Sequence, residues 1–374
     1  MRKRGIIAAL ALMVLTLTTS AQNAVNIASL RKDAAAGNVK AQVALANRLL
    51  SGKGVQTNYQ EAAEWFAKAA NKGNLEAMFN LAFCHEKGYG VPKSMAEAVK
   101  WYTKAADKGN LQALNSLGHC YEEGAEEFDR NYAKAAECYR KAADKGYAPA
   151  QFNLGSCYYQ MKGVDLNYKE AIKWWEKAAA QGNSAALYNL GYCYLRGEGV
   201  DKDDTKAFDY FRRLADSGDP RSQFEVGKMY AQGIGVDQDG MKAMSYFIKS
   251  AEKGYSPAQL AVGRYYDNGV YVDQDYEEAA RWYLKAAQQG NAEAQYNIGN
   301  MFFHGMGMAQ DYDEAFKWME KAALQGNASA QTGVGICYYY GYGVKRNKNT
   351  GREWINKAAV MGDSYAKDVL KTLK

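Results

Sequence analysis

The chain has 374 residues, of which 48% are hydrophobic and 24% are charged, with 36 glycines and only 4 prolines. This composition is typical of a folded protein and excludes an intrinsically disordered one. The formal net charge of +6 is small for this length, and no basic tract is long enough to indicate nucleic-acid binding.

The first 21 residues have the pattern of a secretory signal peptide. A basic segment at 2–4 precedes an apolar run over 6–17, and small residues follow at 19–21. The run is shorter than the roughly 20 apolar residues of an ordinary membrane span, and no cysteine closely follows it that could carry a lipid. We expect cleavage after Ala21, export to the periplasm or beyond the cell, and no membrane span afterwards; an uncleaved anchor is the alternative.

From residue 37 onward the sequence repeats itself. A glycine marks each end of every repeat, and these glycines are 36 residues apart (73 − 37), except in the longer third repeat (146 − 109 = 37). They are Gly37, Gly73, Gly109, Gly146, Gly182, Gly218, Gly254, Gly290, Gly326 and Gly362. A period of this length is typical of solenoids, so nine repeats over 37–361 replace the two or more domains that the length would suggest.

Each repeat is predicted to form two antiparallel helices, A and B. In the fifth repeat Ala186, Leu190 and Cys193 recur at spacings of three and four, and Phe208 and Phe211 do so after the segment GEGVDKDD. A left-handed glycine should end helix A. Alanines in helix B, and glycines in helix A, should let the two helices approach closely.

Five repeats are predicted to begin helix B with a capping box. In this motif the first side chain accepts a hydrogen bond from an amide of the opening turn, and a glutamate three residues later reaches back. The pairs are Asn58/Glu61, Ser94/Glu97, Asn167/Glu170, Asp275/Glu278 and Asp311/Glu314.

One helix pair cannot bury its apolar faces alone, so neighbouring repeats must stack. The predicted fold is therefore all-α: a right-handed α-α superhelical solenoid of helix-turn-helix repeats. We expect a capping helix within 22–36 at the front, and another within 362–374 at the back.

Four motifs recur along the chain: A-x-x-x-L-G-x-x-Y, G-x-G-V, D-Y-x-x-A and W-x-x-K-A-A, as in AQFNLGSCY, GEGV, DYEEA and WYLKAA. They resemble the Sel1-like repeats, relatives of the tetratricopeptide repeats, over everything after about residue 26. Two repeats depart from the pattern: GAEEFDRN replaces the turn in the third, and Arg352 is expected at the helix B alanine position in the ninth.

The resemblance implies a non-catalytic adaptor that holds proteins together. Secreted bacterial members of the family are linked with envelope or host contact. The family also includes cysteine-rich secreted proteins that bind or slowly hydrolyse β-lactams.

Most of the cysteines are predicted to be packing residues. Five hold the same place in their repeats, where Met229 and Met301 replace cysteine in others; they are Cys84, Cys120, Cys157, Cys193 and Cys337. Neighbouring copies should lie about 10 Å apart, too far for disulfides. Cys138 instead holds the tryptophan position of helix B. A Cys120–Cys138 disulfide is one hypothesis, which an exported protein permits; a pair of separate thiols is the other.

No metal site, cofactor or catalytic residue is expected. His85, His119 and His304 lie in different repeats without zinc-ligand spacing. No G-x-S-x-G nucleophile elbow occurs, and the Gly-x-Gly turns lack the lysine of a phosphate loop. We therefore expect no enzymatic activity.

Binding is expected on helix A, which lines the concave side in relatives of this architecture. The positions seven, ten and fourteen residues after the repeat glycine form a stripe that varies between repeats, whereas packing demands uniformity. The candidate ligand-binding residues are Asn80, Asn153, Asn189, Tyr192, Arg196, Lys228, Arg264, Asn297, Asn300 and His304. Two alternatives stay open: the asparagines could serve contacts between repeats, and the charges could be solvated surface.

The functional hypothesis is an exported, non-catalytic scaffold that binds a protein or peptide partner through this stripe. Two alternatives remain: a binder of peptidoglycan or another glycan, and a weak hydrolase of the β-lactam or cell-wall type.

Overall fold

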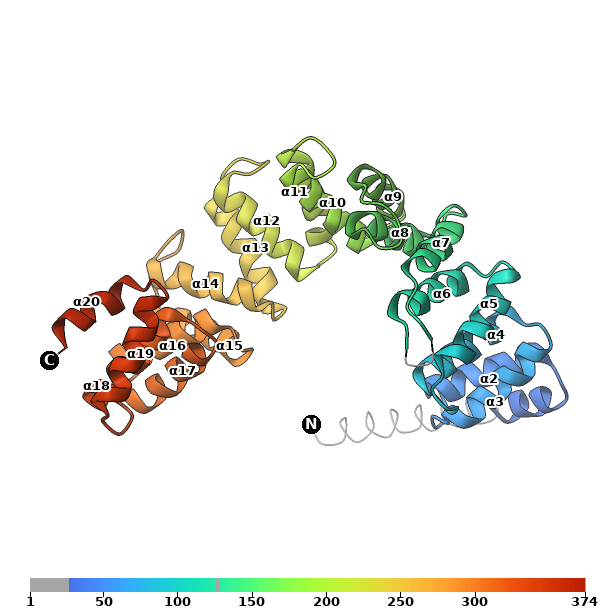
Figure 1. Cartoon of the computed structure of the whole chain (residues 1–374), viewed down its shortest axis with the longest axis horizontal. Coiled ribbons are helices and arrows are strands. Elements are labelled where there is room, and N and C mark those ends of the chain that lie inside the picture. Colours follow the sequence, from blue (N-terminus) through green and yellow to red (C-terminus); the bar gives the residue numbers. More distant parts are fainter. Residues whose placement is uncertain (1–26, 126–127, 374) are drawn as a thin grey trace, which may run out of the picture. The chain divides into compact units, whose positions relative to one another are not determined.

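In the computed structural model of the protein, residues 27–125 and 128–373 are described, so the predicted signal peptide lies outside them. The chain divides into two compact units, an N-terminal unit up to Ala186 and a C-terminal unit from Leu187. Both consist of helices joined by short turns (Figure 1). Extended pairing in the described residues is limited to one bridge between Ala125 and Phe128. The predicted all-α class is confirmed.

The N-terminal unit begins with a helix over 27–35, followed by four helix pairs. Its A helices are α2 (Val39–Ser51), α4 (Leu75–Lys87), α6 (Leu111–Glu123) and α8 (Ala148–Gln160). Its B helices are α3 (Tyr59–Asn71), α5 (Met95–Asp107), α7 (Tyr132–Ala143) and α9 (Tyr168–Ala180). From α2 to α9 each helix packs against the next one, as in a solenoid.

The same alternation continues through the C-terminal unit. The A helices are α10 (Ser184–Arg196), which spans the boundary, α12 (Pro220–Gln232), α14 (Ser256–Asn268), α16 (Ala292–His304) and α18 (Ala328–Tyr340). The B helices are α11 (Asp204–Asp216), α13 (Gly240–Glu252), α15 (Tyr276–Gln288), α17 (Tyr312–Leu324) and α19 (Lys348–Val360). The chain ends in α20 (Ser364–Thr372), which packs on α19 and α18.

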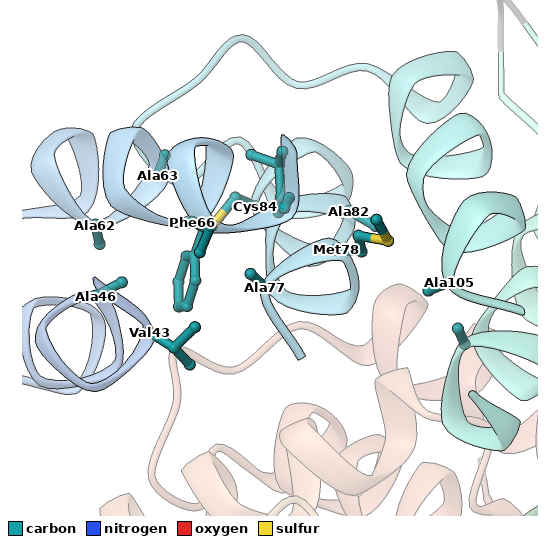
Figure 2. Packing of buried hydrophobic residues seen from close by; sticks show 14 of the residues in the cluster. Val43, Ala46, Ala62, Ala63, Phe66, Ala77, Met78, Ala82, Cys84 and Ala105 are labelled. Atoms are coloured by element: carbon teal, nitrogen blue, oxygen red, sulfur yellow. The ribbon is translucent and has the colours of Figure 1, made fainter. Parts of the chain in front are cut away.

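The core is organised around one large side chain from each helix B. Phe66 of α3 is fully buried and points toward Val43 of α2 (Figure 2). In later repeats a ring at this position lies directly on a helix A glycine: a Cβ atom added at Gly118 would lie 2.5 Å from the Tyr139 ring. The predicted close approach of helices A and B is confirmed, and the ring explains why glycine is needed in helix A.

The second glycine of the turn faces helix B of the preceding repeat. A Cβ atom at Gly90 would lie 2.0 Å from the Tyr59 carbonyl oxygen, which no side chain could tolerate. In the seventh repeat Tyr271 takes this position with φ of 62°, and the facing helix B residue is Gly240. The large residue and the glycine have exchanged places, so the close contact is kept.

Of the two hydrogen bonds predicted for the capping box, the one accepted by the N-cap side chain is confirmed and the one from the N-cap amide to the glutamate is wrong. The N-cap side chains accept from the amide three residues later, as Asn58 does from Glu61 at 3.0 Å. The N-cap amide, however, donates to the last turn of helix A, as Asn58 N does to Leu49 O at 3.0 Å. That carbonyl lies at a helix end and needs a partner, so the amide is not available to the glutamate. The glutamates pair with cations instead: Glu61 with Arg31, Glu97 with Lys100, Glu170 with Lys173, Glu278 with Arg281 and Glu314 with Lys317.

The ninth repeat also requires a correction. Gly351, not Arg352, holds the helix B alanine position; Gly351 is buried, whereas Arg352 is exposed. A Cβ atom at Gly351 would lie 2.7 Å from the Gly335 carbonyl oxygen. Helices α18 and α19 therefore approach closely through two facing glycines, and this repeat keeps the packing of the others.

Buried glutamines link successive repeats, which the sequence analysis did not foresee. Their Nε2 atoms donate to the end of the preceding helix B, as Gln259 does to Ala251 O at 3.1 Å. A second glutamine thirty residues later (289 − 259) donates to the Oε1 atom of the first, as Gln289 does to Gln259 at 2.7 Å. The same arrangement joins Gln181 to Gln151 and Gln325 to Gln295.

Candidate binding face on helices A

We define the helix A stripe as the residues seven, ten and fourteen positions after each repeat glycine. In the N-terminal unit its asparagines join neighbouring repeats. Asn80 Nδ2 donates to Asn47 Oδ1 at 3.1 Å. Asn153 Nδ2 lies 2.9 Å from Asn115 Oδ1 and 3.1 Å from His119 Nε2. Asn80 and Asn153 therefore do make contacts between repeats, and a role in ligand binding stays a prediction.

A cavity of about 530 Å³ opens on this face between α6 and α8. Its size falls within the range of ligand sites. The stripe residues in its wall are His119, Glu123, Asn153, Ser156 and Gln160, and Arg130 and Lys162 enter from the segments that follow α6 and α8. Of the predicted site residues of this unit, the cavity includes Asn153.

Glu122 gives this cavity a fixed charge pair. It accepts hydrogen bonds from the Tyr139 hydroxyl at 3.0 Å and from Lys162 Nζ at 2.7 Å. Burial alone would raise the pKa of Glu122, but these bonds and the charge of Lys162 outweigh it, so the pKa is lowered. The same hydrogen bond raises the pKa of Lys162. Both groups are therefore charged at neutral pH.

Two cations flank one aromatic ring at the cavity wall. The Arg130 guanidinium carbon and Lys162 Nζ each lie 5.7 Å from the centre of the Tyr132 ring. The Arg130 side chain also donates to the Glu123 carbonyl at 3.2 and 3.3 Å. The cavity thus offers positive charge, aromatic surface and amide groups to a ligand.

In the C-terminal unit two of the three predicted stripe cations form ion pairs with carboxylates of helices A. Lys228 Nζ lies 2.8 Å from Glu225 Oε2, and Glu225 is buried. Arg264 pairs with Glu293 of the following repeat. An acidic ligand group would therefore share these cations with carboxylates of the chain.

The first stripe residues of this unit form an aromatic surface. Tyr192 is half-buried, with its ring centre 5.1 Å from those of Phe211 and Tyr188. Burial, with the Tyr188 hydrogen bond, raises the pKa of Tyr192. Arg196 lies 5.1 Å over the Tyr192 ring, and Asn189 is half-buried one turn earlier.

A second cavity, of about 260 Å³, lies among α16, α18 and α20. The predicted site residues Asn300 and His304 both line it, with Tyr296, Ile336 and Tyr365. Asn297, on the same helix, is half-buried but does not line the cavity. Two of the residues predicted from the sequence thus line this cavity.

The predicted packing role of the cysteines is confirmed by their burial. Cys84, Cys120, Cys157, Cys193 and Cys337 are all buried free thiols. Burial raises the pKa of Cys84 and Cys193 to about 11, and that of Cys120, Cys157 and Cys337 to about 12. Such thiols are protonated at neutral pH and are poor nucleophiles.

The structure gives no support to the disulfide hypothesis. Cys120 and Cys138 are separate thiols, both buried in the same apolar cluster. Cys138 lies on α7 among apolar side chains, where burial raises its pKa to about 11. The alternative, two separate thiols, is the arrangement observed.

Over residues 27–125 and 128–373 no group of three or more histidine, cysteine or acidic side chains could hold a metal ion. Among the helices described, none is long and apolar enough to cross a membrane.

Several residues of the larger cavity were not predicted from the sequence. His119 and Glu123 occupy the stripe positions of the third repeat (109 + 10 and 109 + 14), so extending the stripe to that repeat would have found them. Glu122, Arg130, Tyr132 and Lys162 lie outside the stripe positions. Arg130 belongs to GAEEFDRN, and the departure of this segment from the repeat pattern was the sequence signal that could have indicated it.

Comparison with known families identifies the repeats. The Sel1 repeat model matches nine consecutive segments: 39–74, 75–110, 111–147, 148–183, 184–219, 220–255, 256–291, 292–327 and 328–363. The chain therefore belongs to the Sel1 repeat family. Sel1 repeat proteins generally act as scaffolds for protein–protein interactions, and their fold is typically non-catalytic.

Two solved structures resemble most of the chain. The c5321 protein of uropathogenic Escherichia coli, described as a protective antigen with an SLR fold, is 31% identical, over 93% of this chain and 91% of that one, with a TM-score of 0.55. A Sel1 repeat protein from Oxalobacter formigenes is 30% identical, over 81% of this chain and 87% of that one, with a TM-score of 0.65. No curated protein matches the chain.

Proposed function

We propose that this Sel1 repeat protein is an exported, non-catalytic scaffold that binds a protein partner through the helix A stripe. One observation carries the proposal: a cavity in each compact unit opens among stripe residues. These residues differ from repeat to repeat, whereas the packing residues recur. Variable side chains around a preformed hollow are what a specific binding surface requires.

The chemistry of the cavities favours a protein as the partner. The larger cavity combines charged side chains of both signs with Tyr132 and Phe152, and the smaller one combines Asn300 and His304 with apolar and aromatic groups. Tyrosine and arginine are among the side chains enriched at the energetically dominant positions of protein interfaces.

Export is supported by the sequence and by one relative. The segment 1–21 has the charge, apolar run and small residues of a signal peptide. The E. coli relative is described as a protective antigen. If the chain is exported, N-terminal sequencing of the mature protein should begin at Gln22. A mature protein that starts at Met1 would contradict this part of the proposal.

Interface mapping tests the stripe. Ser156→Arg and Asn300→Arg place a long charged side chain in the two cavities, because each residue lines one of them. Glu64→Arg and Leu324→Arg are matched controls, since both residues are exposed on helices B. We expect the stripe variants to lose a partner from envelope and secreted fractions, and the controls to retain it. Equal retention by all four variants would reject the stripe.

A further inference from the structure

The third repeat lacks an aromatic side chain at a position where the other repeats have one. The position lies 28 residues after the repeat glycine (65 − 37), or 29 in the longer third repeat (138 − 109). Its aromatic occupants are Trp65, Trp101, Trp174, Tyr210, Tyr246, Trp282, Trp318 and Trp354. In the third repeat it is Cys138.

A lysine three residues later covers the ring in most repeats. Lys177 Nζ lies 3.8 Å from the centre of the Trp174 ring, and Lys285 Nζ lies 3.8 Å from that of Trp282. At this distance a cation is attracted by the face of the ring. The third repeat keeps the lysine as Lys141 but has Cys138 in place of the ring, and Lys141 Nζ lies 2.7 Å from Glu137 Oε1.

A cavity of about 250 Å³ lies at the position of the missing ring. Cys138 and Lys141 both line it, and Leu114, Leu117 and Tyr121 of α6 contribute apolar surface. Helix α5 closes the other side with Ala106. The volume is smaller than that of cavities for drug-sized ligands, which start at about 300 Å³. It suits a single aromatic side chain.

We propose that this cavity binds a tryptophan or tyrosine side chain of a protein partner. The occupant follows from the chain itself, because the other repeats fill the same place with these side chains. A ring that enters would contact Leu114 and Leu117 and approach the ammonium group of Lys141. The wall also includes Thr103, Asp107, Lys134 and Glu137, and a tryptophan or tyrosine side chain, with an apolar ring and a polar group, matches such a mixed lining.

This site is independent of the helix A stripe. Cys138, Lys141 and Glu137 belong to helix α7, a helix B, and none of the cavity residues is a stripe residue. The two surfaces can therefore be tested separately, and failure of one leaves the other standing.

The direct test uses 5-fluoroindole as the probe and the full chain as the protein, with binding followed by fluorine NMR. The wild type should bind it saturably at one site. Cys138→Trp restores the side chain of the other repeats, so it should fill the cavity and weaken binding roughly tenfold or more, which corresponds to at least about 1.4 kcal/mol. The stripe variant Asn300→Arg should bind as the wild type does.

A second variant provides a gain of binding. Trp282→Cys removes the ring beneath Lys285, so it should create a second site in the seventh repeat and raise the number of bound probes from one to two. Circular dichroism should show that each variant keeps its helices. If Trp282→Cys does not fold, the same substitution at Trp101, beneath Lys104 at 4.1 Å, replaces it.

A short peptide shows whether the ring can be presented by a partner protein. A Gly-Trp-Gly peptide with blocked ends should displace the probe, whereas Gly-Ala-Gly should not. The proposal is overturned if the wild type binds no probe saturably, if Cys138→Trp binds it as well as the wild type, or if the tryptophan peptide fails to compete.

Discussion

The Tyr139 hydroxyl donates a 3.0 Å hydrogen bond to Glu122 Oε2. The relationship recurs, since Tyr102 donates to Glu86 at 2.8 Å and Tyr283 donates to Asp267 at 3.1 Å. Repeats with phenylalanine at the tyrosine position carry an apolar residue at the acid position instead: Leu50 with Phe66, Leu195 with Phe211 and Ala231 with Phe247. A buried hydroxyl needs an acceptor, so the two positions vary together.

A double-mutant cycle tests this coupling at Tyr283 and Asp267. Asp267→Leu leaves the buried tyrosine hydroxyl without its acceptor and should cost about 1–3 kcal/mol. Adding Tyr283→Phe recreates the Phe–Leu pair of other repeats and should recover part of that loss. Urea unfolding measures each variant. If the two substitutions simply add, the proposed coupling is absent.

Glu122 should make the stability of the N-terminal unit depend on pH. Burial raises the pKa of Glu122. The hydrogen bonds from Lys162 and Tyr139 and the charge of Lys162 lower this pKa by a larger amount, so the pKa in the folded state lies below the ordinary value of 4.5. The carboxylate therefore stabilises the fold above its unfolded pKa, and this contribution is lost as the pH falls through the folded pKa.

The comparison of wild type with Glu122→Gln gives the measurement. At pH 7 the variant should be less stable by about 1 kcal/mol, and the difference should shrink below about pH 4.5. In Lys162→Met the free energy of unfolding should depend less on pH than it does in the wild type. A difference that stays constant from pH 7 to pH 3 would show that ionisation of Glu122 contributes nothing.

Met161 is predicted to be a weak point of the fourth repeat. It ends α8 in the left-handed conformation with φ of 57°, where most repeats have glycine. Its side chain is 63% exposed, so little packing is lost on removal. Met161→Gly should stabilise the protein by about 1 kcal/mol, because a left-handed residue with a Cβ atom costs about that much. Met161→Ala keeps the Cβ atom and should give no such gain; equal stabilities of the two variants would refute the explanation.

A buried hydrogen-bond acceptor near the C-terminus has no donor. Gln331 Oε1 is buried without a hydrogen-bond partner. The residue thirty positions later (361 − 331) is Met361, the C-cap of α19. The C-caps of α9, α15 and α17 are glutamines, which donate a hydrogen bond to the equivalent Oε1 atom in their repeats. Met361→Gln should therefore stabilise the ninth repeat by about 1 kcal/mol. The neighbouring Val360→Gln, at an 88% exposed position, is the control, and the prediction is wrong if both variants gain equally in thermal unfolding.

The sequence predicts helices, turns and the buried thiols well because a period of 36 residues averages the signal over many copies. A glycine such as Gly118 is interpretable because its counterparts recur in other repeats. The predicted hydrogen bond from the N-cap amide to the glutamate was wrong. The Asn58 amide donates to the Leu49 carbonyl oxygen instead, and this depends on where the end of helix A lies in space.

The cavities were harder to predict because they arise where the repeat is irregular. The larger one includes Arg130, which belongs to the irregular segment of the third repeat, and the one beside Cys138 exists because a side chain is smaller than its counterparts. Periodicity describes what the repeats share. The proposed binding surfaces depend on the differences between repeats, and these surfaces can be located only in the packed structure.

The central claim, that the stripe on helices A carries recognition, is tested most directly by site-specific photo-crosslinking in the native host. A crosslinking residue at Ser156 or Asn300 lines a stripe cavity, whereas one at Lys173 or Lys317 is exposed on helix B. The account predicts one discrete protein adduct from each stripe position and none from the helix B positions. Adducts that arise from Lys173 and Lys317 but not from the stripe would contradict it.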